Sequence, residues 1–93
     1  MDRIELDVSE EEAPTPLLRA TEELQKLADD SYLHIIHRMA PCRLYNYLEA
    51  NNFYVETRSG EGGLCEIFIC HDSADEIKSH IALLVQNMKP WQQ

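Results

Sequence analysis

The sequence predicts an α+β fold, a two-layer α/β sandwich in the order β-α-β-α-β-β with a four-stranded mixed sheet and an extra C-terminal helix. Three observations predict this fold. Charged and apolar residues alternate near the start of the chain, which is typical of a half-buried strand. Prolines followed by apolar residues at helical spacing mark two helix starts. A glycine-rich segment between two later apolar segments indicates a hairpin.

The first half of the chain is expected to form a strand, a helix and a second strand. Residues Arg3–Val8 place charged side chains on one face and apolar side chains on the other. Thr15 is suited to cap the following helix, and Pro16 suits the first helical position, where a missing N–H costs nothing. Apolar residues then recur at helical spacing, at Leu17, Ala20, Leu24 and Leu27. Tyr32–His37 has high β propensity, with apolar residues on both faces, and predicts the second strand.

The second half is expected to add a helix, a hairpin and a final helix. The helix is predicted from about Pro41 to Asn51. Strands Phe53–Arg58 and Leu64–Cys70 are predicted to pair antiparallel around the loop Ser59–Gly63. The C-terminal helix, residues 73–88, follows a capping-box pattern and ends before a proline. A right-handed crossover makes the first two strands parallel neighbours, with the first two helices on one sheet face.

Length and composition limit the class of protein. The 93 residues show no composition break, so we expect one domain over 1–93 with its core in residues 3–70. Seventeen acidic residues against eight Lys and Arg give a formal charge of −9, which disfavours nucleic-acid binding because it repels phosphates. Three cysteines without framework spacing fit reduced thiols, and no apolar run reaches the ~20 residues of a membrane helix. We therefore expect a cytoplasmic protein without membrane contact.

The best candidate ligand site lies where the loops after the first two strands converge. Loops at the carboxyl ends of parallel strands meet, and here they carry residues 12–16 and 37–43. Both helix N-termini point into this region and favour an anion or a thiolate. The candidate ligand-binding residues are His37, Arg38, Cys42, Arg43 and Thr15. A small anionic ligand is one partner that such a site would accept.

Cys42 is the candidate nucleophile, because a helix N-terminus and nearby arginines lower the pKa of a thiol. The alternative, which we favour, is that Cys42 packs as a small apolar residue at the helix start. His37 has the same two interpretations, since a histidine at a strand end is more often hydrogen-bonded to a loop than catalytic. His34 and His37 lie on opposite faces of their strand, so they cannot bind a metal together. No metal site and no cofactor are expected.

The opening segments resemble a known family. Ile4–Val8 followed by Ala13-Pro14-Thr15-Pro16-Leu17 resembles the start of the TusA-like, or SirA-like, sulfur-carrier proteins, whose hallmark is Cys-Pro-x-Pro at the start of the first helix. The resemblance covers residues 3–70 and implies a two-layer sandwich of two helices on a four-stranded mixed sheet. This chain has Ala13 where the family's sulfur-accepting cysteine belongs, and alanine cannot form a persulfide. The family's carrier chemistry is therefore not expected at this position.

The chain is more similar to a branch of that superfamily, a domain-of-unknown-function family that also lacks the cysteine. Proteins of that branch often carry a histidine-containing segment before a proline and a Leu-Tyr pair. These positions are here His37-Arg38-Met39-Ala40-Pro41 and Leu44-Tyr45. The branch typically has Asp after the histidine, where this chain has Arg38, so the possible site of the branch is altered. The resemblance implies a fold and lends no activity.

We expect a non-enzymatic binding or adaptor protein, linked to sulfur, redox or metal-cofactor metabolism. The alternative is a sulfur or redox carrier in which Cys42 replaces the missing cysteine. The sheet face opposite the two helices is expected to be too apolar to face water, with Tyr32, His34, Ile36, Tyr54, Phe68 and Cys70. Either the C-terminal helix covers this face within one chain, or the helices of two chains pack together. The homodimer would use Ile77, Ile81, Leu84, Val85 and Met88.

Overall fold

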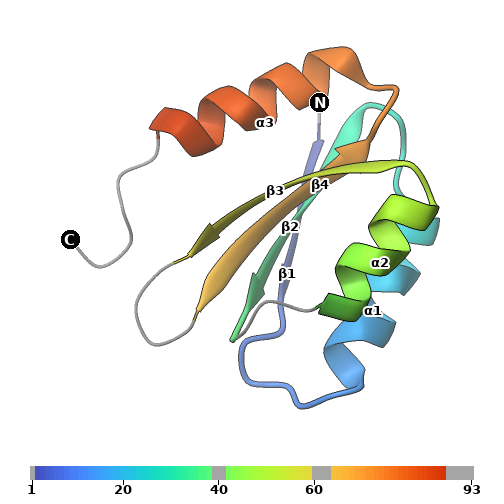
Figure 1. The fold of residues 1–93 in the computed structure, drawn as a ribbon, viewed down its shortest axis with the longest axis vertical. Helices are drawn as coiled ribbons and strands as arrows, with labels where there is room; N and C mark the ends of the chain where they lie inside the picture. Colours follow the sequence, from blue (N-terminus) through green and yellow to red (C-terminus); the bar gives the residue numbers. More distant parts are fainter. Residues whose placement is uncertain (1, 39–41, 60–63, 88–93) are drawn as a thin grey trace.

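The computed structural model describes residues 2–38, 42–59 and 64–87. The α+β class and the expected order of elements are confirmed (Figure 1). The elements are β1 (Asp2–Asp7), α1 (Thr15–Gln25), β2 (Ser31–His37), α2 (Cys42–Ala50), β3 (Phe53–Ser59), β4 (Cys65–His71) and α3 (Asp75–Asn87). The strands and helices lie within a few residues of their predicted bounds. The glycine-rich loop at 60–63 is outside the described residues.

The strands form one mixed sheet in the order β1-β2-β4-β3. β1 pairs parallel with β2, as the crossover rule predicts, and places Leu6 beside Ile35. β3 pairs antiparallel with β4, as expected for a hairpin, and places Val55 beside Ile69. β4 also pairs antiparallel with β2, so it lies in the middle of the sheet. β1 and β3 are therefore the two edge strands.

The helix starts differ from the sequence expectation at two positions. The prediction that Thr15 caps α1 is wrong, because Thr15 is already helical and Pro14 occupies the cap position without a side-chain hydrogen bond. The Leu18 amide donates to the Pro14 carbonyl at 3.1 Å, so the helix begins at Thr15, one residue earlier than expected. α3 begins at Asp75, so Ala74 and not Ser73 precedes its first helical residue. The predicted start of α2 at Pro41 is outside the described residues.

α1 and α2 cover the same face of the sheet and form the larger core with it (Figure 1). Alternate residues of β2 and β4 point toward the helices, and apart from Cys65 the buried ones are aliphatic. Leu33, Ile35, Ile67 and Ile69 are fully buried there. The buried helix residues are Ala20, Leu24, Leu44 and Leu48.

α3 packs on the opposite face of the sheet, within the same chain (Figure 1). Its residues Ile77 and Ile81 are buried against Tyr32, Phe68 and Cys70 of β2 and β4. Of the two expected ways to cover this face, the structure therefore contains the intrachain one. Leu84 and Val85 are partly buried against the same cluster, whereas Leu83 is 58% exposed. Met88 is outside the described residues.

Candidate functional site

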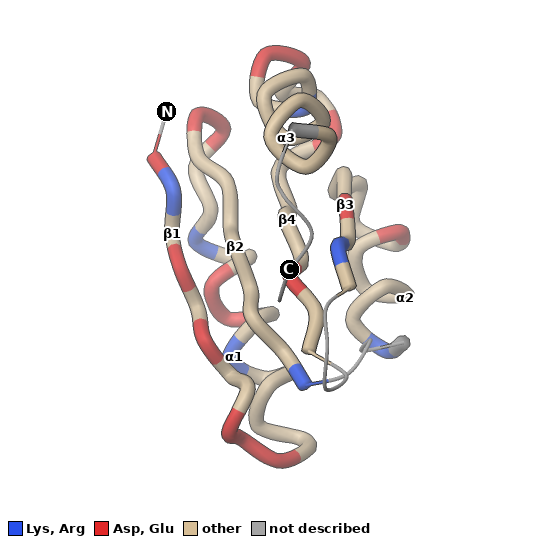
Figure 2. The backbone as a smooth tube through the Cα atoms, turned by 90° about the vertical axis from the view of Figure 1, so that its left-hand side faces the viewer, with Lys and Arg blue, Asp and Glu red and all other residues tan. Residues whose placement is uncertain are grey.

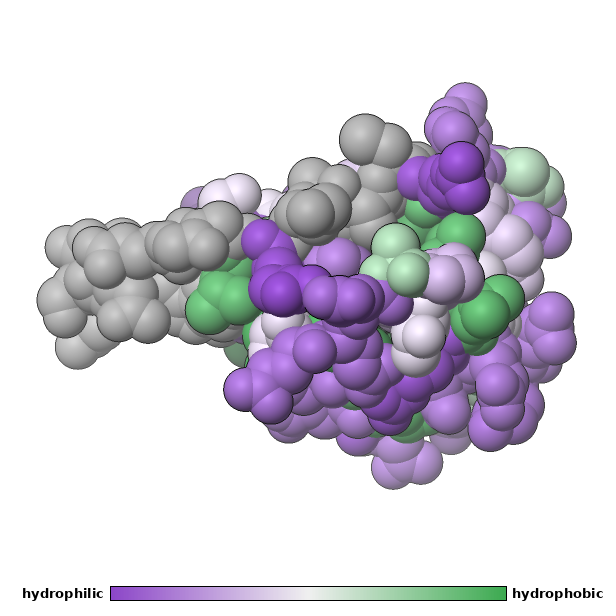
Figure 3. Space-filling view, turned by 90° about the horizontal axis from the view of Figure 1, so that it is seen from below, coloured by the Kyte–Doolittle hydropathy of each residue, from purple (hydrophilic) through white to green (hydrophobic). Residues whose placement is uncertain are grey.

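The predicted ligand region lies at the end of the sheet where β1 and β2 finish and α1 and α2 begin (Figure 1). The Val8 amide donates to the Ile36 carbonyl at 2.9 Å, so the two strands remain paired up to the loops. Viewed onto this end, hydrophilic side chains predominate, with apolar side chains between them (Figure 3). The loops converge as expected from the parallel pairing of β1 and β2.

Two arginines contact Glu11 at this end, and none of the predicted site residues had included this acid. The Arg19 guanidinium forms an ion pair with the Glu11 carboxylate. The Arg38 guanidinium donates to the Glu11 backbone carbonyl at 3.2 Å. The chain thus supplies its own anion where we expected an external one. Arg38 contacts the β1–α1 loop through a backbone carbonyl, so its guanidinium has a hydrogen-bond partner within the protein.

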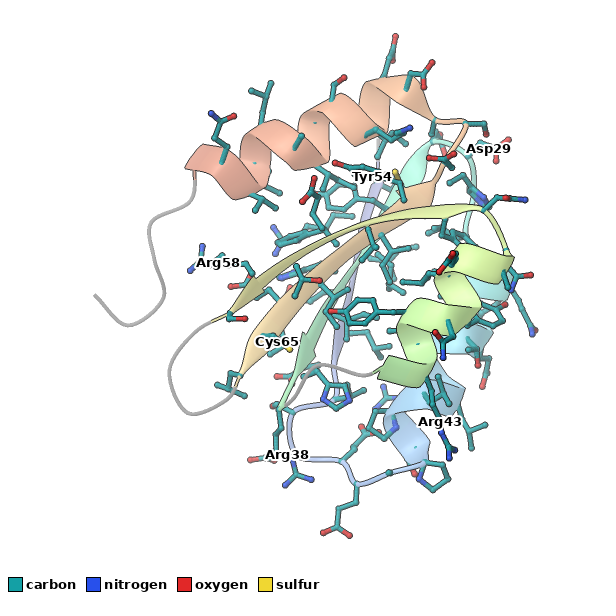
Figure 4. The ribbon with its side chains drawn as sticks, in the orientation of Figure 1. Asp29, Arg38, Arg43, Tyr54, Arg58 and Cys65 are labelled. Carbon is teal, nitrogen blue, oxygen red and sulfur yellow. The ribbon has the colours of Figure 1, made fainter. Side chains whose placement is uncertain are left out.

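The remaining candidate residues are near this end but are not gathered into one cluster. Burial, together with the neighbouring Arg38 charge, lowers the pKa of His37, so its neutral imidazole is favoured. Thr15 and Arg43 are exposed. Arg38 and Arg43 extend from different elements at the lower end of the molecule and point apart (Figure 4). Cys42 is the first residue of α2, and its side chain is outside the described part of the chain.

The two other cysteines are structural residues of the sheet. Cys65 lies in the core under α1 and α2, and Cys70 lies under α3. Burial raises the pKa of the Cys65 thiol and raises that of Cys70 to about 11. Because the thiolate is the reactive form of cysteine, both thiols are poor nucleophiles at neutral pH.

A polar cluster lies on the face that α3 shares: His34 and Glu66 are buried, Arg58 is partly buried and Arg3 is exposed. His34 of β2 and Glu66 of β4 are each 3% exposed. The His34 Nε2 atom lies 2.9 Å from Glu66 Oε2. The Arg3 Nη2 atom lies 2.6 Å from His34 Nδ1, and the Arg58 Nε atom lies 3.8 Å from Glu66 Oε1. The cluster therefore joins β1, β2, β4 and β3 across the whole sheet.

The geometry determines the protonation of His34. Arginine carries only hydrogen-bond donors, so the His34 Nδ1 atom must accept from Arg3 and cannot carry the ring proton. The Nε2 atom therefore carries the proton and donates it to Glu66. Burial lowers the pKa of His34, and the Arg3 charge adds to this effect, while the hydrogen bond to Glu66 opposes it. His34 is thus held as the neutral Nε2–H tautomer, stacked on Phe68 with ring centroids 4.5 Å apart.

Sequence reasoning placed His34 on this sheet face but did not find its polar partners. These partners could have been found from the two-residue alternation of side chains along β1, β3 and β4. That alternation puts Arg3, Arg58 and Glu66 on the same sheet face as His34. The pairing of β2 with β4 was also needed, because it places His34 beside Phe68 and Ile36 beside Glu66. That pairing joins strands that are not consecutive in the chain.

Acidic residues outnumber basic residues on the exposed surface of the described chain. Among the described basic residues, six contact a partner within the chain, namely Arg3, Arg19, Lys26, Arg38, Arg58 and Lys78. Many acids are instead exposed, and they follow β1, its loop and the start of α3 (Figure 2). The exposed acids are Asp2, Glu5, Asp7, Glu10, Glu12, Glu22, Asp29, Asp30, Glu49, Asp72, Asp75 and Glu76.

A hollow of about 280 Å³ lies between the α1–β2 turn and the start of α3. Its walls include Asp29, Asp30, Asp75 and Glu76. The last two stand in the first turn of α3, where negative charge stabilises the helix dipole. In the described part of the chain, no group of three or more His, Cys, Asp or Glu side chains is arranged to hold a metal ion. No helix within the described ranges has the length and apolarity to cross a membrane.

Comparison with protein-family models, curated proteins and solved structures gives no match for this chain. The TusA-like resemblance therefore stays a prediction from the sequence.

Proposed function

We propose that this protein is a non-enzymatic binding or adaptor protein whose partner is a protein with a cationic surface. The observation that carries the proposal is the uneven use of charge. Twelve described acids are exposed, against five described basic residues, namely Arg3, Arg19, Lys26, Arg38 and Arg43. Together with the formal charge of −9, this distribution gives the surface a largely negative electrostatic potential.

A negative surface of this kind favours association with a positively charged protein, because it steers the encounter and raises the association rate. It disfavours nucleic acids and small anions as partners. The ion pair between Arg19 and Glu11 also argues against a small anion as the ligand, because a carboxylate of the chain already lies in the region where an external anion was expected. The TusA-like resemblance suggests sulfur, redox or metal-cofactor metabolism as the setting.

The alternative remains a sulfur or redox carrier that uses Cys42. Its support is the position of this residue at the first turn of α2, where the helix N-terminus favours a thiolate. Cys65 and Cys70 give the carrier no support, because both are buried and their pKa values are raised. The two functions differ in whether Cys42 is needed.

The test uses the tagged full chain, purified from native lysate at low and high salt, beside the Cys42→Ser variant. We expect the same basic protein to be retained by both forms and to be lost at high salt, because exposed charges are screened. Mass spectrometry of the purified chain reports any persulfide on Cys42. Loss of the partner in the Cys42→Ser variant, or a persulfide on Cys42 without a retained basic protein, would favour the carrier and refute the adaptor.

A further inference from the structure

We propose that His34 is a proton-sensitive latch that holds the edge strand β1 to the sheet: its neutral ring binds Arg3 and Glu66 together, and its protonated ring releases Arg3. The latch does not depend on the identity of a partner. It rests on the geometry of two hydrogen bonds on opposite sides of one buried imidazole, at 2.6 Å from Arg3 and 2.9 Å from Glu66.

Protonation changes these two bonds in opposite directions. A proton added at Nδ1 turns that nitrogen from an acceptor into a donor, and it then faces the Arg3 guanidinium, which has only donors. The contact becomes a repulsion between two cations. The Nε2–H bond to Glu66 gains strength at the same time, because both partners are then charged. The imidazolium therefore stays with Glu66 on β4 and expels Arg3 on β1.

Among the described residues, the hydrogen bond recorded at the His34 Nδ1 atom is the one from Arg3. From β1, Arg3 faces Nδ1, and Glu5 is the residue paired with His34 across the strands. From β4, Phe68 stacks on the ring, and Glu66 faces Nε2.

The titratable groups of the other packed elements have partners of their own. On β3, the Tyr54 hydroxyl donates to Glu56, and Arg58 approaches Glu66. On α3, His80 contacts Tyr32, and Lys78 lies over the Tyr54 ring while pairing with Asp72. Glu5 and Glu66 favour the imidazolium, whereas Arg3 and burial disfavour it. Arg3 is thus the one cation in this set that contacts the ring directly.

β1 is the strand that such a release would affect. It is an edge strand whose only neighbour in the sheet is β2. Its inward side is anchored by Leu6, which is buried, and by Ile4, which is partly buried. Its outward side carries Arg3, Glu5 and Asp7, which are exposed. Losing the Arg3 contact therefore removes a side-chain anchor from the N-terminal half of an edge strand.

The sign of the pH effect follows from the direction of the shift. The pKa of His34 in the folded protein is below the ordinary value of about 6.5. States in which β1 is open and His34 is hydrated therefore bind a proton at higher pH than the closed state does. The closed state is favoured above about pH 6.5, and this advantage is lost as the pH falls toward the folded pKa.

Nuclear magnetic resonance tests the latch on the full chain in two measurements. Imidazole nitrogen shifts at neutral pH are expected to show the proton of His34 on Nε2. Amide hydrogen exchange, corrected for its intrinsic pH dependence, is expected to show protection of β1 amides falling by up to about tenfold per pH unit below about pH 6.5. Amides shared by β3 and β4 are expected to keep their protection.

Three variants separate the latch from a merely structural contact. His34→Gln keeps an acceptor and a donor without titrating, so its β1 protection should not depend on pH. Arg3→Met should raise the His34 titration midpoint, while Lys26→Met should leave it unchanged, because it removes a cation just after α1, the helix on the other face of the sheet. The Arg3→Met measurement decides the matter even where His34→Gln does not fold. A proton on Nδ1 at neutral pH, pH-independent β1 protection in the natural protein, or an unchanged midpoint in Arg3→Met would overturn the proposal.

Discussion

Truncation of Ile81 to alanine tests the attachment of α3 to its own sheet. Ile81 is 0% exposed and packs with Tyr32, Phe68 and Cys70. The change deletes three buried carbons, which at about 0.8 kcal/mol each gives a transfer term of about 2.4 kcal/mol. The cavity left behind adds to this term, so we expect a loss of about 3–4 kcal/mol in the free energy of unfolding. A chain of 93 residues is stable by roughly 5–14 kcal/mol in total, so the loss is large.

Urea denaturation followed by far-ultraviolet circular dichroism measures this loss as a lower midpoint at an unchanged slope. Leu83→Ala is the matched control on the same helix, because Leu83 is 58% exposed and its truncation should cost no more than about 0.5 kcal/mol. Equal midpoints for the two variants would refute the packing argument. A midpoint that depends on protein concentration would refute it as well, because α3 would then be stabilised by a second chain.

Two further predictions concern single residues. Asn52 has a φ of 60°, so Asn52→Ala should lower the free energy of unfolding by about 1 kcal/mol while Asn52→Gly is tolerated, as urea denaturation of both variants can check. Burial, followed by the neighbouring Glu56, raises the pKa of Tyr54 to about 12. Its phenol therefore ionises first in the unfolded chain, and stability should fall as the pH rises from about 10 to about 12. Glu56→Gln should lower the Tyr54 midpoint in an ultraviolet titration, with Tyr54→Phe identifying its signal, and an unchanged midpoint would contradict the assignment.

The order of elements could be predicted because local patterns determine it. Alternation in residues 3–8 and helical spacing from Leu17 onward are visible in any short window of the sequence. The intrachain position of α3 was one of two alternatives, because an amphipathic helix shows only that its apolar face is buried and not what buries it. Ile81 would look the same in the sequence under either arrangement.

The contacts of the candidate site were harder to predict, because they join residues far apart in the chain. Glu11 stands in a run of three acids, and only the folded loop shows that Arg19 and Arg38 reach it. His34 and Glu66 are 32 positions apart and meet because β4 inserts beside β2. Neither of these contacts can be recognised from a short stretch of the sequence.

The two faces of the sheet differ in the side chains that they bury and in the number of helices that cover them. The face under α1 and α2 is lined by aliphatic side chains and is covered by both helices. On the other face, α3 covers the apolar cluster around Phe68, while the buried polar residues His34 and Glu66 satisfy each other. Buried polar groups that are hydrogen-bonded avoid most of the free-energy cost of leaving water. His34 and Glu66 can therefore be buried on this face without being surrounded by apolar side chains alone. One helix therefore covers the apolar part of a face that the sequence pattern indicated was too apolar to face water, and the same arrangement places the titratable ring of His34 on β2, beside the edge strand β1.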